Sequence, residues 1–428
     1  MTDGGNPANT VAVIGAGIVG VSTALCLQRD GHNVILIDKA GAGEGASSGN
    51  GGILASCSVV PVTVPGLFFK APGMLFSADG PLFLRWSYLP KLTPWLLRYL
   101  RGCRPQETKR IAGAIAGLVG NSLEEHQALA AGTPAERWLK PSDYVYVYRD
   151  RAAFEGDSFG WNLRKAHGVT WEEMEGKAFR DYDPLFADDQ GFAVRLTEHH
   201  GHITDPGAYV QALADHVVAG GGRFIRAEVT DIVRDAGGDG AGDKGRVSGV
   251  VAGGETIACD AAVVALGAWS GPLMKKLGIT VPLESERGYH VEFLEPSAMP
   301  RAPVMVASGK FVATPMDGRL RLAGIVEFGG LDAPASRAPI ELLKRQAKMT
   351  MPGLTWKGTR EWLGHRPAPC DSIPLIGGLE GAPGAYVGFG HHHIGLTAGP
   401  RTGRILADVI SGRRPNIDLA PYRPERFS

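Results

Sequence analysis

Residues 10–39 read TVAVIGAGIVGVSTALCLQRDGHNVILIDK and predict how the fold begins. Residues 11–14 form a short apolar run, and glycines follow in the pattern G-x-G-x-x-G. Residues 19–29 then carry apolar side chains at helical spacing. Residues 34–37 form a second apolar run that ends at Asp38. This order predicts a strand, a glycine turn, a helix and a second strand.

Each glycine of the pattern has a physical task in a Rossmann-type dinucleotide site. Gly15 makes the tight turn, Gly17 lets the backbone approach a pyrophosphate, and Gly20 lets the helix pack on the strand. The helix N-terminus offers free N–H groups to the phosphates. Asp38 follows Gly20 at the spacing of a ribose-hydroxyl acceptor. An acid at this place argues against a 2′-phosphate on the cofactor.

The next segment favours FAD over a nicotinamide cofactor. Residues 41–52 read GAGEGASSGNGG, a loop longer than most strand–helix connections. Such a loop can wrap a bulky cofactor with backbone donors, although the same composition is also typical of a surface linker. The chain then enters an aromatic, proline-rich region, residues 59–104, rather than another strand–helix unit.

Length and composition exclude several classes of protein. A chain of 428 residues predicts two domains. Its formal net charge of zero argues against electrostatic nucleic-acid binding. The five cysteines are scattered and predict buried free thiols. The N-terminal residues lack a signal-peptide pattern and no long apolar run occurs, so we expect a cytoplasmic protein.

Further strand–helix patterns recur along the chain, with material for an antiparallel sheet between them. The pattern predicts a helix over 206–219, buried strands over 261–265 and 385–389, and a helix over 396–411. The predicted fold class is α/β with an α+β substrate domain. A Rossmann-like FAD-binding domain is built from 1–58, 200–285 and 358–428. The interleaved antiparallel-sheet substrate domain is built from 59–199 and 286–357.

Residues 388–397, GFGHHHIGLT, place three histidines in a row between glycines. Histidine clusters are common in metal sites. Consecutive strand residues alternate between faces, however, so His392 is expected to point away from His391 and His393, toward packing or solvent. We therefore expect no metal site here.

With these pieces in order, the chain resembles the FAD-dependent D-amino-acid oxidoreductase superfamily over nearly its whole length. The superfamily includes D-amino-acid oxidase, glycine oxidase, sarcosine oxidase and the small subunit of bacterial D-amino-acid dehydrogenase, and the likeness is greatest to the dehydrogenases. The similar segments are VIGAGIVG, VILID, SSGNGGI, DPGAYVQAL, AAVVALGAWS, WLGHRPAPCDSIPLIG and GFGHHHIGLTAGPRTGRILADVISG.

The resemblance implies where FAD binds. Sarcosine oxidases attach the flavin to a cysteine several residues before the aspartate of this motif, whereas Cys370 immediately precedes Asp371 here. We therefore expect non-covalent FAD. The implied cofactor-binding residues are Gly15, Gly17, Ile18, Val19, Gly20, Asp38, Lys39, Ser47, Ser48, Asn50, Gly51, Gly52, Val229, Gly267, Trp269, Gly395, Leu396 and Thr397.

The resemblance also implies four catalytic residues. Arg366 matches an arginine that binds the substrate carboxylate, and the alternative is a structural salt bridge. Tyr289 is implied as a lid residue or second carboxylate partner, and the alternative is a core residue. His391 matches a histidine of the turn that faces the isoalloxazine ring, and His393 falls where some relatives contact the substrate.

The implied reaction is oxidation of the C–N bond of a D-amino acid. The α-hydrogen moves as hydride to flavin N5, and water hydrolyses the imino acid to a 2-oxo acid and ammonia. Alternative substrates are a secondary amine (sarcosine, an opine, D-proline or hydroxy-D-proline) and a 2-hydroxy acid. The non-enzyme alternative is a flavin-binding assembly subunit. The implied electron acceptor is a quinone or another carrier.

Residues 67–100 are apolar and aromatic and suit contact with the inner face of the cell membrane. Their cations match anionic headgroups; these are Lys70, Arg85, Lys91, Arg98 and, just beyond, Arg101. The alternative is that the same segment packs on the substrate domain.

Overall fold

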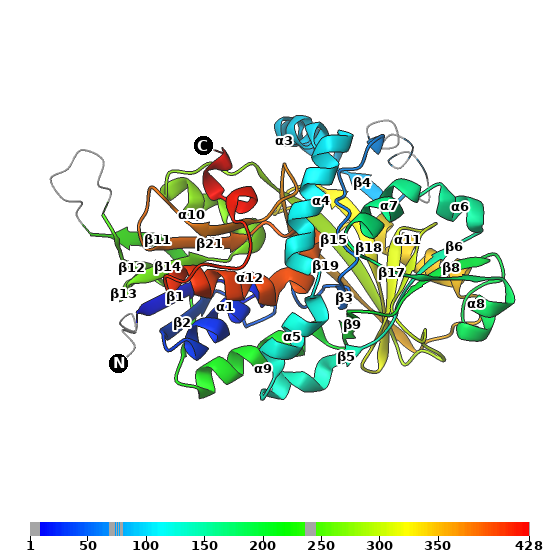
Figure 1. Cartoon of the computed structure of the whole chain (residues 1–428), viewed down its shortest axis with the longest axis horizontal. Coiled ribbons are helices and arrows are strands. Elements are labelled where there is room, and N and C mark those ends of the chain that lie inside the picture. The colour runs from blue at the N-terminus through cyan, green and yellow to red at the C-terminus, as the bar shows by residue number, and fades with distance from the viewer. Residues whose placement is uncertain are drawn as a thin grey trace.

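The computed structural model describes residues 9–67, 73, 75, 77, 80–235 and 245–427. Within these residues the strands form a six-stranded sheet, a nine-stranded sheet and two three-stranded sheets. Figure 1 shows β1, β14 and β21 of the first sheet in one half of the molecule and β17, β6 and β8 of the second in the other. The helix α4 lies between the two halves in this view.

The six-stranded sheet has the order β10-β2-β1-β14-β21-β20. Its first five strands are parallel, and β20 pairs antiparallel with β21 at the edge. The bounds are β1 Thr10–Ile14, β2 Asn33–Asp38, β10 Arg223–Arg226, β14 Ala261–Val264, β20 Leu375–Gly378 and β21 Ala385–Phe389. A parallel sheet built on sequential strand–helix units is the predicted Rossmann-like arrangement.

Both faces of this sheet are covered, which explains why β1 is apolar throughout. Val11 and Val13 belong to a core shared with the helices, and Ala12 and Ile14 to a core shared with a small sheet. The helices are α1 Ile18–Arg29, α9 Pro206–Ala219 and α12 Gly395–Ile410. The small sheet is β11 Val229–Arg234, β12 Val247–Ala252 and β13 Glu255–Ala258.

The nine-stranded sheet has the order β19-β15-β18-β17-β16-β6-β8-β7, and β4 pairs with β18. The bounds are β4 Leu82–Leu84, β6 Tyr144–Tyr148, β7 Glu172–Glu175, β8 Phe192–Leu196, β15 Leu283–Leu294, β16 Val304–Val306, β17 Phe311–Met316, β18 Arg319–Phe328 and β19 Gly358–Pro369. The helix α11, Arg337–Thr350, packs Ile340 and Leu343 on one face of this sheet. On the other face, Phe154 and Trp161 pack on β6 and β8, and residues of the central strands line the cavity described below.

The remaining elements connect the two large sheets or cover their edges. A second small sheet contains β3 Ile53–Ala55, β9 His200–Ile203 and β5 Leu139–Pro141. The helices are α3 Leu89–Arg101, α4 Pro105–Val119, α5 Ser122–Ala130, α6 Arg151–Glu155, α7 Ser158–Ala166, α8 Lys177–Tyr182 and α10 Gly271–Lys276. Short 3₁₀ turns are Trp86–Tyr88, Pro134–Trp138, Gly267–Trp269, His392–Ile394, Ala420–Tyr422 and Pro424–Phe427.

The observed elements agree closely with the sequence patterns, and the strands interleave as expected. The predicted helix over 206–219 matches α9, and the predicted strand over 385–389 matches β21. The strand β19 comes from a segment predicted to be FAD-binding, yet it pairs with β15 in the nine-stranded sheet. The division into two domains at the predicted boundaries stays a prediction.

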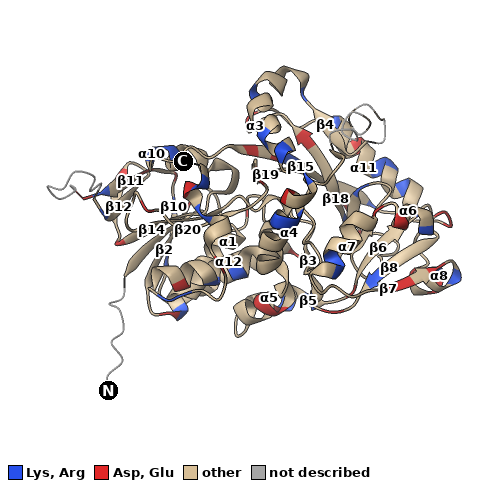
Figure 2. Cartoon of the chain, turned by 45° about the horizontal axis from the view of Figure 1, so that its top comes forward, with Lys and Arg blue, Asp and Glu red and all other residues tan. Residues whose placement is uncertain are grey.

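Charged residues of both signs are mixed over the helices and loops (Figure 2), in keeping with the zero net charge of the chain. Among the described residues, no helix has both the length and the apolar character needed to cross a bilayer. Lys70, which belongs to the predicted membrane-contacting segment, lies outside the described residues.

Candidate active site

A cavity of about 1110 Å³ opens at the carboxyl edge of the parallel sheet and extends over the free face of the nine-stranded sheet. Residues that follow four parallel strands line it, namely Gly15 after β1, Lys39 after β2, Gly267 after β14 and His391 after β21. In open α/β sheets, ligands bind at this edge because the carboxyl ends of the strands and the helix N-termini meet there.

The glycine turn after β1 leaves the backbone open to a ligand. Gly15 has a φ of +110°, and a Cβ there would lie 2.4 Å from the Ala265 carbonyl oxygen. A Cβ at Gly20 would lie 1.8 Å from the Gly15 carbonyl oxygen, so Gly20 has the predicted packing position. The helix α1 begins after Gly17, and the Ile18 N–H donates to Ser47 Oγ at 3.0 Å. This exposed helix start fits a cofactor pyrophosphate.

Asp38 and the wall beside it fit the next part of a dinucleotide. Asp38 Oδ2 accepts from the Ala16 N–H at 2.7 Å, and Oδ1 accepts from the Ala40 N–H at 2.9 Å. Each carboxylate oxygen keeps a second lone pair, and Asp38 lines the cavity. Lys39 Nζ lies 5.4 Å from the centre of the Trp269 ring, and both residues line the cavity.

The glycine-rich loop is fixed on the large sheet rather than free as a linker. Arg321 on β18 donates to the Ser48 carbonyl at 2.8 Å and to the Asn50 carbonyl. The His290 ring on β15 is hydrogen-bonded to the Gly49 carbonyl at 3.0 Å. Asn50 Nδ2 donates to the His393 carbonyl at 3.5 Å, so the loop also contacts the histidine turn.

Almost all of the predicted cofactor-binding residues lie on this one cavity. Gly20, Ser48 and Gly52 are outside its lining, and the others line it. The first residues of α12, which begins at Gly395, also line the cavity. Within the described ranges, no group of three histidine, cysteine or acidic residues is arranged to hold a metal ion.

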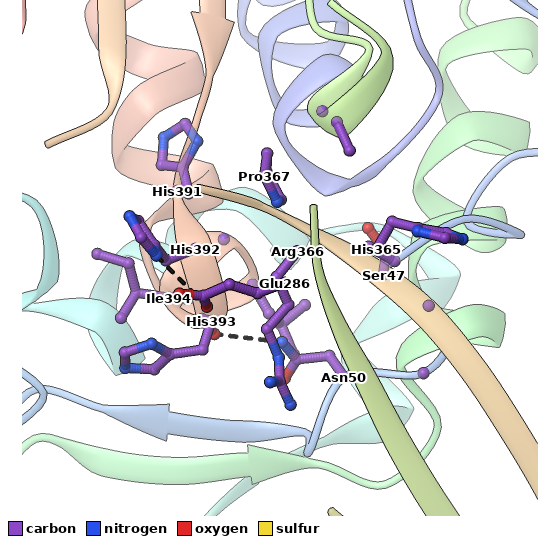
Figure 3. Close-up of a pocket in the computed structure, with 18 of the residues that line it drawn as sticks. Ser47, Asn50, Glu286, His365, Arg366, Pro367, His391, His392, His393 and Ile394 are labelled. Carbon is purple, nitrogen blue, oxygen red and sulfur yellow. Dashed lines mark hydrogen bonds and ion pairs between the residues drawn. The ribbon is translucent and has the colours of Figure 1, made fainter. Parts of the chain in front are cut away.

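The three histidines do not alternate as strand residues, because the chain has left β21 before it reaches them. Gly390 has a φ of +88° and His392 a φ of +47°, and a 3₁₀ turn starts at His392. The prediction that His392 points away toward packing or solvent is therefore wrong. Its ring is buried beside Glu286, with 3.5 Å between His392 Nδ1 and Glu286 Oε2 (Figure 3).

The other two histidines face different surroundings. His391 is buried and hydrogen-bonded to Thr402 Oγ1 at 3.0 Å, and burial lowers its pKa to about 3. Figure 3 shows its ring turned away from the rings of His392 and His393. His393 has surface open to the cavity, and its pKa is lowered to about 4 by the surrounding protein and by His392 and Arg366. Both rings are neutral near pH 7.

Arg366 on β19 reaches into the cavity without a protein partner. Its guanidinium lies over Gly288, where a Cβ would be 2.7 Å from Arg366 Cζ. Among the described residues, the Arg366 side chain makes no hydrogen bond and no ion pair within 4.0 Å, although it lines the cavity. Burial lowers the pKa of Arg366, and nearby Glu286 opposes that shift. An enclosed guanidinium left open in this way is suited to an anionic ligand.

Tyr289 contributes to the cavity wall, but its hydroxyl is engaged elsewhere. It donates to Glu327 Oε2 at 2.7 Å and accepts from the Ser336 N–H at 2.9 Å and from Arg287 Nη2 at 3.3 Å. The residue is 1% exposed. These bonds use the hydrogen-bonding capacity of the hydroxyl, so the geometry favours the alternative of a core residue over a carboxylate partner.

Sequence reasoning missed two buried polar groups that line the same cavity as Arg366. Glu286 lines the cavity from β15, and the Tyr99 hydroxyl on α3 is buried with no hydrogen-bond partner among the described residues. Neither lies in a recognisable motif, because the fold brings them together from distant segments. Cys370 is 6% exposed and outside the cavity lining, and burial raises its pKa to about 11.

The fold and this cavity agree with the comparisons to known proteins. The profile of the FAD dependent oxidoreductase family, abbreviated DAO, matches residues 10–409, and the chain belongs to this family. It is therefore an FAD-dependent oxidoreductase. The glycine turn, Asp38 and the loop that contains Ser47 and Asn50 fit that cofactor, as the preceding geometry shows.

Individual relatives cover nearly the whole chain. A D-amino-acid oxidase of Bradyrhizobium diazoefficiens is 39% identical over 424 residues, which are 97% of this chain and 98% of the relative. A D-amino acid dehydrogenase of the same organism is 28% identical over 98% of this chain and 99% of its own. The structure of glycine oxidase from Geobacillus kaustophilus has the same fold, with a TM-score of 0.71, 22% identity and coverage of 97% of this chain and 98% of that one.

Proposed function

We propose that this oxidoreductase oxidises the C–N bond of a D-amino acid to an imino acid, which water hydrolyses to a 2-oxo acid and ammonia. The observation that carries the proposal is the unpartnered Arg366 guanidinium in the cavity. A guanidinium binds one carboxylate through two parallel hydrogen bonds, which fixes the α-carbon in place. The names of the relatives, which specify D-amino acids, support the same substrate class.

The cavity residues would hold FAD non-covalently. Gly15, Gly17 and Ile18 would surround the pyrophosphate, and Asp38 would accept from a ribose hydroxyl. When bound, FAD supplies the two-electron acceptor for the hydride that leaves the α-carbon. Cys370 lies away from the cavity, so acid precipitation should release the flavin into the supernatant.

The protein's part in the reaction is positioning. Arg366 would hold the carboxylate, and the walls of the cavity would decide which substituent of the α-carbon faces the flavin. His391 and His393 are neutral near pH 7, since burial lowers the pKa of each. They would therefore shape the cavity without adding positive charge to it. Tyr289 would support the cavity wall as a core residue, through its bonds to Glu327 and Ser336.

The relatives are named either oxidase or dehydrogenase, and these two activities differ in their electron acceptor. The resemblance of the sequence implies a dehydrogenase that reduces a quinone. The relative with 39% identity is named an oxidase, whereas the dehydrogenase of the same organism is 28% identical, and this favours molecular oxygen. Oxygen consumption with one peroxide per 2-oxo acid supports an oxidase. Reoxidation by a quinone analogue but not by oxygen would identify a dehydrogenase.

Contact with an anionic membrane surface stays a second proposal, and α3 carries it. Leu92, Trp95 and Tyr99 on this helix are buried, whereas Leu97 is 59% exposed. The inner residues pack on the protein, as Trp95 Nε1 shows by donating to the Ala368 carbonyl at 2.9 Å. The outer face retains Leu97 and the cations Lys91, Arg98 and Arg101. Co-sedimentation with phosphatidylserine vesicles at low salt tests it, and a protein that stays in solution contradicts it.

Product analysis tests the main proposal. Purified protein is supplied with D- and L-amino acids, with N-methyl amino acids and cyclic secondary amines, and with 2-hydroxy acids. A D-amino acid should yield equal amounts of 2-oxo acid and ammonia. A preferred N-methyl substrate would release methylamine if its α-carbon is oxidised, or formaldehyde and a primary amino acid if its methyl carbon is oxidised. A preferred 2-hydroxy acid would yield a 2-oxo acid with no amine. Either of these outcomes would replace the proposed substrate class.

A further inference from the structure

Glu286 is a buried carboxylate that faces the cavity, and no residue in the described part of the chain donates a well-formed hydrogen bond to it. Its side chain is 6% exposed, and it lines the same cavity as Arg366. Within the described residues, His392 Nδ1 lies 3.5 Å from Glu286 Oε2, and the Glu286 carboxylate accepts no hydrogen bond of good geometry. A carboxylate placed in this way carries a desolvation cost unless a ligand supplies the missing donor.

The groups around Glu286 come from three elements. His392 and His393 face it from the turn before α12, and Arg366 faces it from β19. Tyr99 approaches Glu286 from α3, and its hydroxyl is buried. Burial alone would raise the pKa of Glu286, but His392, Arg366 and His393 together lower it below the usual value. Glu286 is therefore negatively charged near neutral pH.

Arg366 and Glu286 offer opposite charges side by side. They are directly opposite in the antiparallel register of β15 and β19, and side chains at such positions start about 5 Å apart. Figure 3 shows the Glu286 carboxylate between the His392 ring and the Arg366 side chain. An α-amino acid carries its ammonium and carboxylate groups on one carbon atom, so one such molecule can contact both residues.

We propose that Glu286 binds the ammonium group of the substrate while Arg366 binds its carboxylate. The inference rests on the proposed function, because it requires an amino acid in the cavity. It adds a specificity determinant, since a 2-hydroxy acid or a simple carboxylate has no cation to place beside Glu286. The competing explanation is that Glu286 only contacts His392 and contacts no ligand.

Two ligands without an α-hydrogen separate these explanations. 2-Aminoisobutyrate and pivalate have nearly the same shape, but the first has an ammonium group where the second has a methyl group. Isothermal titration calorimetry on the FAD-loaded protein gives both dissociation constants without turnover. We expect the wild-type protein to prefer 2-aminoisobutyrate by at least about tenfold, the size of one charge-assisted hydrogen bond. Equal affinity, including no binding of either ligand, would overturn the proposal.

Variants show which residue causes the preference for 2-aminoisobutyrate over pivalate. Glu286→Gln should bring the ratio of the two dissociation constants close to one, and Glu286→Asp should retain part of it. Arg366→Lys should weaken the binding of both ligands and leave the ratio of their dissociation constants unchanged. Glu284→Gln is the matched control, because Glu284 lies two residues away on β15 and accepts from the Tyr88 hydroxyl instead. A ratio that Glu286→Gln leaves unchanged would limit Glu286 to its contact with His392.

The two hypotheses fail in different ways. If the ratio behaves as expected but no D-amino acid is oxidised, the proposed reaction is wrong and the ammonium site stands. If D-amino acids are oxidised and the wild-type protein does not distinguish the two ligands, the reaction stands and the ammonium site is wrong. If Glu286→Gln does not retain FAD, the ratio of dissociation constants in the wild-type protein and in Glu286→Asp still distinguishes the two explanations.

Discussion

Arg366 and Glu286 lie opposite each other on paired antiparallel strands and yet form no ion pair within 4.0 Å. The Arg366 guanidinium extends over Gly288, while the Glu286 carboxylate lies beside the His392 ring. Because a direct bond between the two would satisfy both charges, their separation keeps each available to a ligand. This arrangement is the structural basis for proposing an amino acid as substrate.

Replacing Arg366 by lysine should raise KM strongly while FAD stays bound. Loss of one of two parallel charge-assisted hydrogen bonds costs about 2–3 kcal/mol, which corresponds to a fall in kcat/KM of roughly 30- to 150-fold. Steady-state kinetics with the preferred D-amino acid measures this. Arg360→Lys is the control, because Arg360 is an exposed residue of the same strand. Unchanged kinetics in Arg366→Lys would remove Arg366 from the substrate site.

Replacing Gly15 by alanine should abolish FAD binding. The residue has a φ of +110°, and the added Cβ would lie 2.4 Å from a backbone oxygen, so the turn must shift. The ratio of flavin to protein absorbance after purification with added FAD measures the effect. Gly113→Ala should retain FAD, since Gly113 lies on the exposed side of α4 and a Cβ added there would have no atom within 4 Å. A fully loaded Gly15→Ala protein would contradict this cofactor site.

Replacing Tyr289 by phenylalanine should reduce stability more than activity. The variant loses the hydroxyl that joins Glu327, Ser336 and Arg287, and a buried partner left unsatisfied costs about 1–3 kcal/mol. Urea unfolding of the FAD-loaded protein and steady-state kinetics are measured together. If KM rises markedly while stability is unchanged, Tyr289 contacts the substrate, as the family resemblance implies.

Acidification should destabilise the protein because buried neutral histidines resist protonation in the folded state. His126 is the histidine whose contribution is tested here. His126 is fully buried between Tyr209 and the Leu396 carbonyl, and burial lowers its pKa to about 4. Between pH 6.5 and 4 the unfolded chain takes up a proton that the folded one does not, so the contribution of His126 to stability is complete above about pH 6.5 and is lost as pH falls. Because the pKa of His126 is about 4 in the folded state, its protonation should lower the free energy of unfolding by about 3 kcal/mol at acidic pH.

The measurement is the free energy of unfolding at several pH values. His126→Gln should reduce its slope between pH 6.5 and 4, because the titrating group is gone. His167→Gln should leave the slope unchanged, since His167 is exposed at the end of α7. An equal slope in wild type and His126→Gln would show that other groups control acid unfolding.

The first strand–helix–strand unit could be predicted because its signals are local. The glycine pattern, the helical spacing and Asp38 all lie within residues 10–39, and the structure places them as expected at one edge of the sheet. Arg366 is also predicted, but on family resemblance rather than on local pattern. Its register opposite Glu286 depends on pairing between two distant segments, which no periodicity specifies.

The error at the histidine turn and the alternative favoured at Tyr289 have simple geometric causes. Strand alternation does not extend to His392, because the backbone turns at Gly390 before reaching it. Alternation does hold at β15, where Glu286 and Gly288 face the cavity and the Tyr289 hydroxyl bonds to Glu327 instead. Every residue of β15 from Glu284 to Phe293 is buried, so its pattern of polar and apolar residues does not reveal which set of alternating side chains faces a ligand.

The most direct test of the central claim is anaerobic reduction of the bound flavin by single amino acids. Oxygen-free protein is mixed with D-alanine, L-alanine, sarcosine or D-lactate, and the yellow absorbance is followed while 2-oxo acid is quantified. The account predicts that D-alanine bleaches the flavin with one pyruvate formed per FAD, that L-alanine does not, and that Arg366→Lys needs far more D-alanine for the same rate. Bleaching by L-alanine, sarcosine or D-lactate but not by D-alanine would contradict the account.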